Sequence, residues 1–148
     1  MAMGENNSEE WFESWFNTRW YHMLYQNRDL KEAEQFIQAL MHKLNLPKSS
    51  VLLDAACGAG RHSAQLSAMG YKVHGFDLSE ESIDKARAYE SDSLKFSVAD
   101  LRSFRTDEKF DAVFSFFTSF GYFETEKETV AVLENFKNAL KPKGILMI

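Results

Sequence analysis

The sequence has little cysteine, little proline and no long apolar run. A single cysteine among 148 residues excludes a disulfide framework and suits a reducing compartment. Every apolar stretch falls short of the ~18 residues that a membrane span needs, so we expect none. The N-terminal stretch MAMGENNSEEWFESW carries acids where a signal peptide has a basic and then an apolar region. We therefore expect a cytoplasmic protein.

Positive charge is also scarce. Lysines and arginines number 17 against 22 aspartates and glutamates, which gives a net charge of −5. The sequence-independent attraction to nucleic acids and anionic lipids comes from Lys and Arg, so we expect neither as a partner. With 45% hydrophobic residues and two prolines, the chain can bury one globular core.

The pattern of the sequence changes near residue 50. Residues 9–28 hold all 3 tryptophans and several aromatic pairs at i, i+4 spacing, which predicts one or two short helices. Apolar residues then recur at helical spacing from Leu30 to Leu44. We interpret residues 1–50 as an N-terminal helical cap or lid, and residues 51–148 as the core domain.

After residue 50, short apolar runs alternate with amphipathic helices. Apolar strands joined by helices are typical of an α/β fold, in which a parallel sheet is covered on both faces. In such folds, ligands bind beyond the carboxyl ends of the strands. The predicted strands are 51–53, 72–76, 94–98, 112–116 and 145–148. The predicted helices are 61–69, one N-capped by Ser79, and one opened by a capping box at 125–128 that runs to about residue 140.

The first predicted strand leads into an acid and a glycine-rich loop. The run Asp54–Gly60, DAACGAG, allows a tight turn at Gly58 and Gly60. It departs from the dinucleotide fingerprint G-x-G-x-x-G because Ser63 stands in place of the third glycine. A carboxylate before the loop would also repel a pyrophosphate. A nicotinamide oxidoreductase is therefore the least favoured alternative.

Two further strands are followed by acids. Asp77 follows the second strand, where a carboxylate can accept both hydrogen bonds of a ribose diol. Asp100 follows the third strand, where it can accept a hydrogen bond from the exocyclic amine of a base. Together with Asp54, these acids predict a pocket for a cationic nucleoside without phosphates. S-adenosylmethionine is a ligand of that kind.

The motifs resemble those of class I S-adenosylmethionine-dependent methyltransferases, and the resemblance covers residues 51–148. Val51–Gly60 is similar to that family's first motif, hh-D-h-G-C-G-x-G, with Ala56 in place of its first glycine. Phe116–Phe123 resembles a stretch of bacterial small-molecule methyltransferases, including amino-sugar N-methyltransferases. The ribose, adenine, fourth-strand and fifth-strand motifs match Gly75–Ser79, Val98–Leu101, Phe110–Phe114 and Leu140–Gly144.

The resemblance implies a Rossmann-like sheet of about five strands in the order 3-2-1-4-5, preceded by N-terminal helices. It also implies a role for each motif. The first motif would hold the methionine moiety, Asp77 the ribose hydroxyls, and Asp100 with the Leu101 backbone the adenine. The implied cofactor-binding residues are Asp54, Ala56, Gly58, Gly60, Asp77, Leu78, Asp100, Leu101, Phe116 and Tyr21.

Plainer interpretations stay open. Each acid can be a turn residue, and the aromatic N-terminus can be core packing. Cys57 is interpreted as a small buried residue, because no partner base for a nucleophile is identifiable. His62 can be an exposed residue in the first turn of a helix, and the less favoured alternative is a ligand or a base. The 4 histidines lack metal-ligand spacing, so we expect no metal site.

The implied activity is methyl transfer from S-adenosylmethionine to the nitrogen or oxygen of a small-molecule acceptor, by in-line displacement. An amine acceptor must arrive neutral, and an oxygen acceptor usually needs a base. The sequence identifies no such base. The alternative is a catalytically inactive or incomplete S-adenosylmethionine-binding module that acts through interaction.

The last residues, Ile145–Ile148, form an apolar run. Members of the resembled family usually continue past strand five with a helix and two more strands. We therefore expect those C-terminal strands of the usual seven-stranded sheet to be absent, and the core to be C-terminally truncated. Bare strand edges pair with other chains, so we predict self-association through strand five, or a longer native protein.

Overall fold

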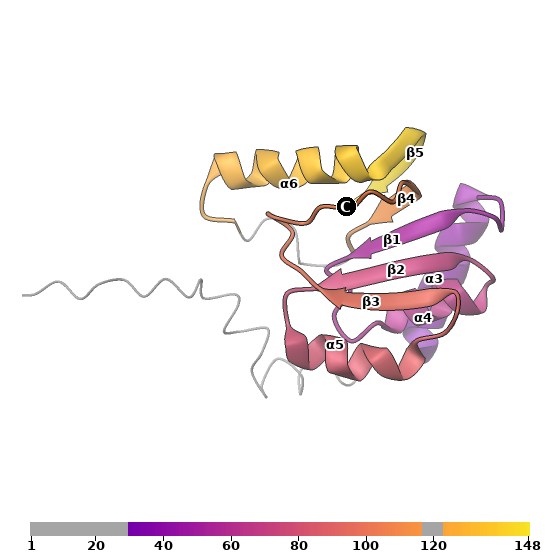
Figure 1. The fold of residues 1–148 in the computed structure, drawn as a ribbon. Coiled ribbons are helices and arrows are strands. Elements are labelled where there is room, and N and C mark those ends of the chain that lie inside the picture. The colour runs from indigo at the N-terminus through magenta and orange to yellow at the C-terminus, as the bar shows by residue number, and fades with distance from the viewer. Residues whose placement is uncertain (1–29, 117–122) are drawn as a thin grey trace, which may run out of the picture.

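The computed structural model describes residues 30–116 and 123–148. Within them, strands form one parallel sheet in the order β3-β2-β1-β4-β5, as Figure 1 shows. The predicted α/β class and the strand order 3-2-1-4-5 are therefore confirmed. The strands are β1 (Val51–Ala55), β2 (Lys72–Asp77), β3 (Leu94–Val98), β4 (Phe110–Phe114) and β5 (Leu140–Met147).

Helices cover both faces of the sheet. Helices α3, α4 and α5 lie on one face and α6 lies on the other (Figure 1). The first face is sealed by a core that includes Ile37, Leu66 and Ile83. The second is sealed by Val132, Phe136 and their neighbours. The helices are α3 (Leu30–Leu44), α4 (Arg61–Ala68), α5 (Glu80–Ala86) with the 3-10 turn η1 (Arg87–Tyr89), and α6 (Glu126–Ala139).

Local sequence signals set the helix starts. The Ser79 side chain accepts a hydrogen bond from the Ser82 amide and caps α5. The predicted capping box of α6 is also confirmed: the Thr125 hydroxyl accepts from the Glu128 amide, and the Glu128 carboxylate accepts from the Thr125 amide. These caps fix where the chain turns from the ligand-facing end of the sheet into each helix.

Strands β4 and β5 begin earlier than the pattern predicts. Strand β4 starts at Phe110 and includes Asp111, whose carboxylate accepts a hydrogen bond from the Val51 amide over 2.7 Å. Pairing of β4 with β5 starts at Leu140, and is interrupted before it resumes between Ala112 and Ile145. Residues 141–144, which precede the predicted strand, thus belong to β5 and contain its irregularity.

Helix α3 packs within the same core as the sheet. Ile37 and Met41 are buried in the cluster that also contains Leu52 of β1 and Leu66 of α4. A boundary at residue 50 and a lid role for residues 1–50 stay predictions, and residues 9–28 lie outside the described part of the chain. In residues 30–116 and 123–148, no helix combines the length and apolarity that crossing a membrane requires.

Candidate cofactor site

The three predicted acids lie at one end of the sheet. Asp54 is the penultimate residue of β1, Asp77 ends β2, and Asp100 comes two residues after β3. Strand β2 pairs with both β1 and β3 in parallel, so the carboxyl ends of the three strands meet at the same edge. The structure therefore brings Asp54, Asp77 and Asp100 to the edge where α/β folds bind ligands.

The loop between β1 and α4 turns on three left-handed residues. Ala56, Gly58 and Gly60 have φ angles of 61°, 56° and 81°. A Cβ on Gly60 would lie 2.7 Å from the Phe96 ring, so that glycine is needed for packing as well as conformation. A Cβ on Gly58 would meet no atom of the described residues within 4 Å. The loop is thus packed against the protein at Gly60 and open at Gly58, where a ligand can approach the backbone.

Asp54 lies beneath this loop, with 1% of its surface exposed. Its carboxylate accepts a hydrogen bond from the Ser63 hydroxyl over 2.5 Å. Burial raises the pKa of Asp54 from 3.8 to about 7, the negative charge of Asp77 adds to the rise, and the Ser63 hydrogen bond opposes it. Asp54 therefore titrates near neutral pH, and a positive charge placed beside it would favour its ionised form.

Asp77 ties the loop to the start of α5. Its Oδ2 accepts a hydrogen bond from the Gly58 amide over 2.8 Å, and its Oδ1 accepts from the Ser79 amide over 2.9 Å. A carboxylate has about four acceptor sites, of which these two amides use two. Leu78, the next predicted residue, is half-buried beside it. The predicted ribose acid thus also fixes the glycine loop.

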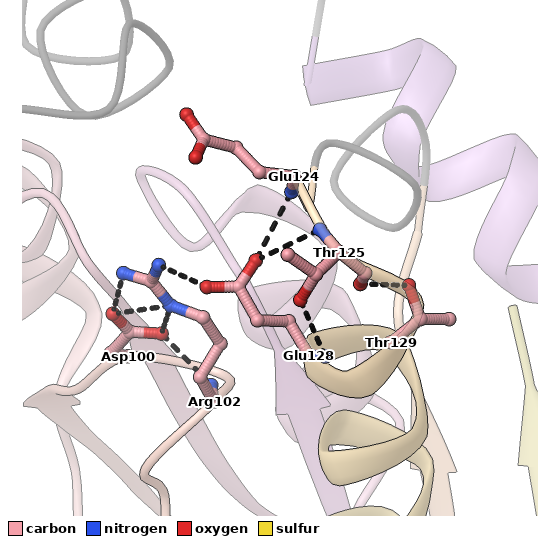
Figure 2. A network of polar contacts seen from close by, with 6 residues as sticks. All are labelled: Asp100, Arg102, Glu124, Thr125, Glu128 and Thr129. Atoms are coloured by element: carbon pink, nitrogen blue, oxygen red, sulfur yellow. Dashed lines mark hydrogen bonds and ion pairs between the residues drawn. The ribbon is translucent and has the colours of Figure 1, made fainter. Parts of the chain in front are cut away.

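Asp100 is held by a neighbouring cation. Arg102 donates to both carboxylate oxygens, and its Nη2 lies 2.6 Å from Oδ2 (Figure 2). Partial burial would raise the pKa of Asp100, but the hydrogen bonds and charge of Arg102 outweigh it, so the pKa lies below its ordinary value. The Leu101 carbonyl accepts from the Asn135 side chain over 2.9 Å. The predicted adenine motif is therefore a rigid, ionised segment.

Phe116 follows β4 and is nearly buried. Its ring lies 5.1 Å from that of His62, 5.6 Å from that of Phe36 and 5.1 Å from that of Phe114, measured between ring centroids. His62 is therefore half-buried among aromatic rings, and the open interpretation of it as an exposed residue is wrong. Tyr21 lies outside the described residues.

Cys57 is buried in the glycine loop. Its amide donates to the Phe76 carbonyl over 2.9 Å, which joins the loop to β2. Burial raises the pKa of its thiol well above the ordinary value, and the charges of Asp54 and Asp77 act in the same direction. This environment supports packing rather than nucleophilic chemistry.

Sequence reasoning missed the residues that hold the acids. Ser63 was noted only as a missing glycine, yet it is the hydrogen-bond donor to Asp54. Asn135 carries no sequence signal, because the carbonyls it holds lie 34 and 33 positions away, and the contact of Arg102 with Glu128 is also distant, at 26 positions. An arginine two residues after a strand-end acid is the pattern that could have pointed to the Asp100–Arg102 pair.

The arrangement fits a ligand with several hydrogen-bond donors and a positive charge. Three carboxyl groups and an open glycine suit the ammonium, sulfonium, ribose diol and adenine amine of S-adenosylmethionine. The same carboxyl groups would repel the phosphates of a nucleotide bound in the cofactor position. Within the described ranges, no group of three His, Cys, Asp or Glu side chains is placed to hold a metal ion.

Comparisons with known proteins identify the family of the chain. Residues 52–144 match the family model of a methyltransferase domain. The dTDP-3-amino-3,4,6-trideoxy-alpha-D-glucopyranose N,N-dimethyltransferase of Streptomyces venezuelae is 36% identical over 102 residues, which are 69% of this chain and 43% of that protein. A second dTDP-amino-sugar N,N-dimethyltransferase, from Streptomyces fradiae, is 32% identical over 74% of this chain and 43% of its own length.

Solved structures share the fold. Streptomyces venezuelae DesVI superimposes with a TM-score of 0.66 at 32% identity, over 85% of this chain and 53% of its own. CalS10, an amino pentose methyltransferase from Micromonospora echinaspora solved with S-adenosylmethionine bound, gives a TM-score of 0.69 at 25% identity, over 88% and 56%. The chain spans about half the length of these relatives. On its motifs, fold and relatives, it belongs to the class I S-adenosylmethionine-dependent methyltransferases of the small-molecule type.

Proposed function

We propose that the chain binds S-adenosylmethionine at the carboxyl ends of β1, β2 and β3 and methylates the amino group of a small molecule. The first acceptor class to test is a nucleotide-linked amino sugar. Support for nitrogen comes from relatives named as amino-sugar N,N-dimethyltransferases and as glycine/sarcosine N-methyltransferases. The observation that carries the proposal is the open face of Gly58, whose amide is fixed on Asp77.

Each side chain then has a task. Asp54 and the Gly58 and Gly60 backbone hold the methionine moiety, with Asp54 ionised beside its ammonium group. Asp77 accepts from the ribose hydroxyls while it keeps the loop in place. The remaining contacts are made by Asp100 and the Leu101 backbone to adenine, with Ala56, Leu78 and Phe116 lining the site.

The chemistry places few demands on the protein. S-adenosylmethionine supplies a methyl group already activated by its sulfonium. The protein has to align the acceptor in line with that methyl and exclude water. An amine that arrives neutral needs no base from the chain, whereas a hydroxyl usually does.

Calorimetric titration of S-adenosylhomocysteine, the cofactor product, tests the binding proposal. Wild type should bind, and Asp77→Asn should bind about 10- to 100-fold more weakly, because hydrogen bonds to a charged acceptor are lost. Asp84→Asn is the matched control, since Asp84 is an exposed acid of α5 paired with Arg87. Absence of both heat and melting shift in wild type would refute the cofactor assignment.

Turnover separates the proposal from its alternative. Wild type incubated with S-adenosylmethionine should methylate an amine from a panel of amino sugars and amino acids, and should leave matched hydroxyl compounds unchanged. Cofactor-product binding without turnover of amine, hydroxyl or carboxylate acceptors would favour a module that binds S-adenosylmethionine and acts through interaction.

We further propose that the chain self-associates through the outer edge of β5. Across residues 30–116 and 123–148, β5 pairs with β4 alone, and Leu146 and Ile148 are exposed. An open strand edge presents N–H and C=O groups to another strand. Light scattering should show a concentration-dependent rise in mass that Leu146→Lys reduces, and a stable monomer at high concentration would contradict self-association.

A cytoplasmic location and the lack of nucleic-acid partners stay predictions from composition.

A further inference from the structure

The guanidinium of Arg102 connects Asp100, at the carboxyl-end edge of the sheet, to helix α6. Arg102 donates hydrogen bonds to the Asp100 carboxylate from Nε and Nη2, and its Nη1 lies 3.3 Å from Oε1 of Glu128 in α6 (Figure 2). The side chains of Asp100, Arg102 and Glu128 are between 22% and 28% exposed. Partly buried, multiply bonded pairs of this kind hold their geometry better than exposed ion pairs.

Glu128 is itself fixed at both carboxylate oxygens. While Oε1 meets Arg102, Oε2 accepts from the Glu124 and Thr125 amides that precede α6. The Thr125 hydroxyl in turn accepts from the Glu128 amide (Figure 2). Arg102 is therefore anchored to the capped first turn of α6, whose own hydrogen bonds hold the Glu128 carboxylate in place.

A second contact from α6 holds the same segment. Asn135 is 5% exposed and its Nδ2 donates to the carbonyls of Leu101 and Arg102 over 2.9 and 3.0 Å. Backbone and side chain of the segment that follows β3 are thus both docked on α6. Movement of Asp100 relative to α6 would have to break several of these bonds at once.

We propose that Arg102 is a positioning residue for the cofactor's adenine: anchored by Glu128, it holds the Asp100 carboxylate in the orientation that accepts from the exocyclic amine. This inference rests on the proposed function, in which Asp100 meets that amine. Without the guanidinium, Asp100 keeps one hydrogen bond, from the Arg102 amide to Oδ1 over 2.8 Å, and that bond alone does not fix the plane of the carboxylate. The rigid fork of the guanidinium fixes the plane of the carboxylate, which a lysine in that position would not do.

A role in folding alone makes a different prediction. If Arg102 and Glu128 served only to stabilise the fold, their loss would weaken every ligand by the same factor. If Arg102 positions Asp100, its loss weakens only a ligand that donates to Asp100. S-adenosylhomocysteine and its 6-deamino analogue separate the two cases, because the second carries a hydrogen at C6 where adenine has its amine and keeps N1 as an acceptor.

The experiment measures the affinity of both compounds by calorimetry. Wild type should prefer S-adenosylhomocysteine. Arg102→Met should lower that affinity about 10-fold, within the range usual for coupled sites, and leave the affinity for the 6-deamino analogue unchanged. Glu128→Gln, whose amide can still complete the capping box, should lower the preference by a smaller factor. In an Arg102→Met background the Glu128 change should have no further effect.

Arg87→Met is the matched control, since Arg87 pairs with Asp84 at the surface of α5 and should leave both affinities unchanged. Equal affinity of wild type for the two compounds, or equal losses for both in Arg102→Met, overturns the positioning role while the proposed function stands. Failure of wild type to bind S-adenosylhomocysteine overturns both. Thermal melts of each variant establish whether it is folded. If Arg102→Met does not fold, the ligand preference of Glu128→Gln tests the positioning role.

Discussion

The Ser63 hydroxyl and the Asp54 carboxylate form a hydrogen bond of 2.5 Å in which both residues are almost completely buried. The bond joins α4 to β1 directly below the glycine loop. Gly75 of β2 leaves room for it, because a Cβ there would lie 3.0 Å from the Ser63 oxygen. A carboxyl group removed from water depends on such a partner far more than a surface group does.

Ser63→Ala should therefore cost stability. Removing the hydroxyl leaves a buried carboxyl without this donor, and such losses amount to about 1–3 kcal/mol. Urea unfolding at pH 8, where Asp54 is ionised, measures the change. Ser67→Ala on the same helix is the control, because Ser67 is half-buried and shares a 3.0 Å hydrogen bond with Ser93. Equal losses in the two variants would contradict the importance of the Asp54 bond.

The raised pKa of Asp54 also predicts how stability changes with pH. Burial raises this pKa from 3.8 to about 7, so between those values the folded protein keeps a proton that the unfolded chain has lost. The free energy of unfolding attributable to Asp54 therefore falls as pH rises from about 4 to about 7 and is level above that. Asp54→Asn lacks this decline, so its stability relative to wild type should increase with pH.

Urea unfolding of wild type and Asp54→Asn at pH 5 and pH 8 makes the comparison. The difference between the two proteins isolates Asp54, because other groups titrate in both. His74 is one of them, with a pKa that burial lowers. Parallel stability profiles for the two proteins would show that Asp54 is ionised throughout.

The fold could be predicted because its signals are local. Apolar runs, the Ser79 cap and the capping box at Thr125 and Glu128 each act within a few residues. The start of β4 could not be found from the apolar run alone, since Asp111 is not apolar and its amide partner, Val51, lies 60 positions away in the chain. The start of β5 at Leu140 depends in the same way on its pairing with Phe110.

The residues of the candidate site also differ in whether their sequence signals are local or distant. Asp54, Asp77 and Asp100 could be predicted because a strand end and an acid are both visible in sequence. Apart from the Asp100–Arg102 pair, which is local in sequence, their supports could not, because the bonds from Arg102 to Glu128 and from Asn135 to Leu101 span 26 and 34 positions. Sequence therefore indicates which groups face a ligand, while the residues that orient those groups emerge only with packing.

Ala56 occupies a backbone conformation that favours glycine. Its φ is 61°, and the resembled motif has glycine at this position. Ala56→Gly should raise the free energy of unfolding by about 1 kcal/mol, the strain of a left-handed alanine less the extra entropy of the unfolded chain. Ala59→Gly is the matched control in the same loop, since Ala59 does not have a positive φ, and it should destabilise. Destabilisation by both changes would show that Ala56 is not strained.

Binding of the cofactor product should depend on pH through Asp54. The ammonium group of S-adenosylhomocysteine is held best by an ionised carboxylate, whereas the pKa of about 7 that burial gives Asp54 leaves much of the free protein protonated below neutral pH. Affinity should therefore rise from pH 6 to pH 8 and then level off.

Binding below pH 7 should release a proton, which calorimetry detects as a heat that varies with the ionisation enthalpy of the buffer. Asp54→Asn should bind more weakly and lose both the pH dependence and the proton release. A rise in affinity that survives in Asp54→Asn would place the titrating group elsewhere.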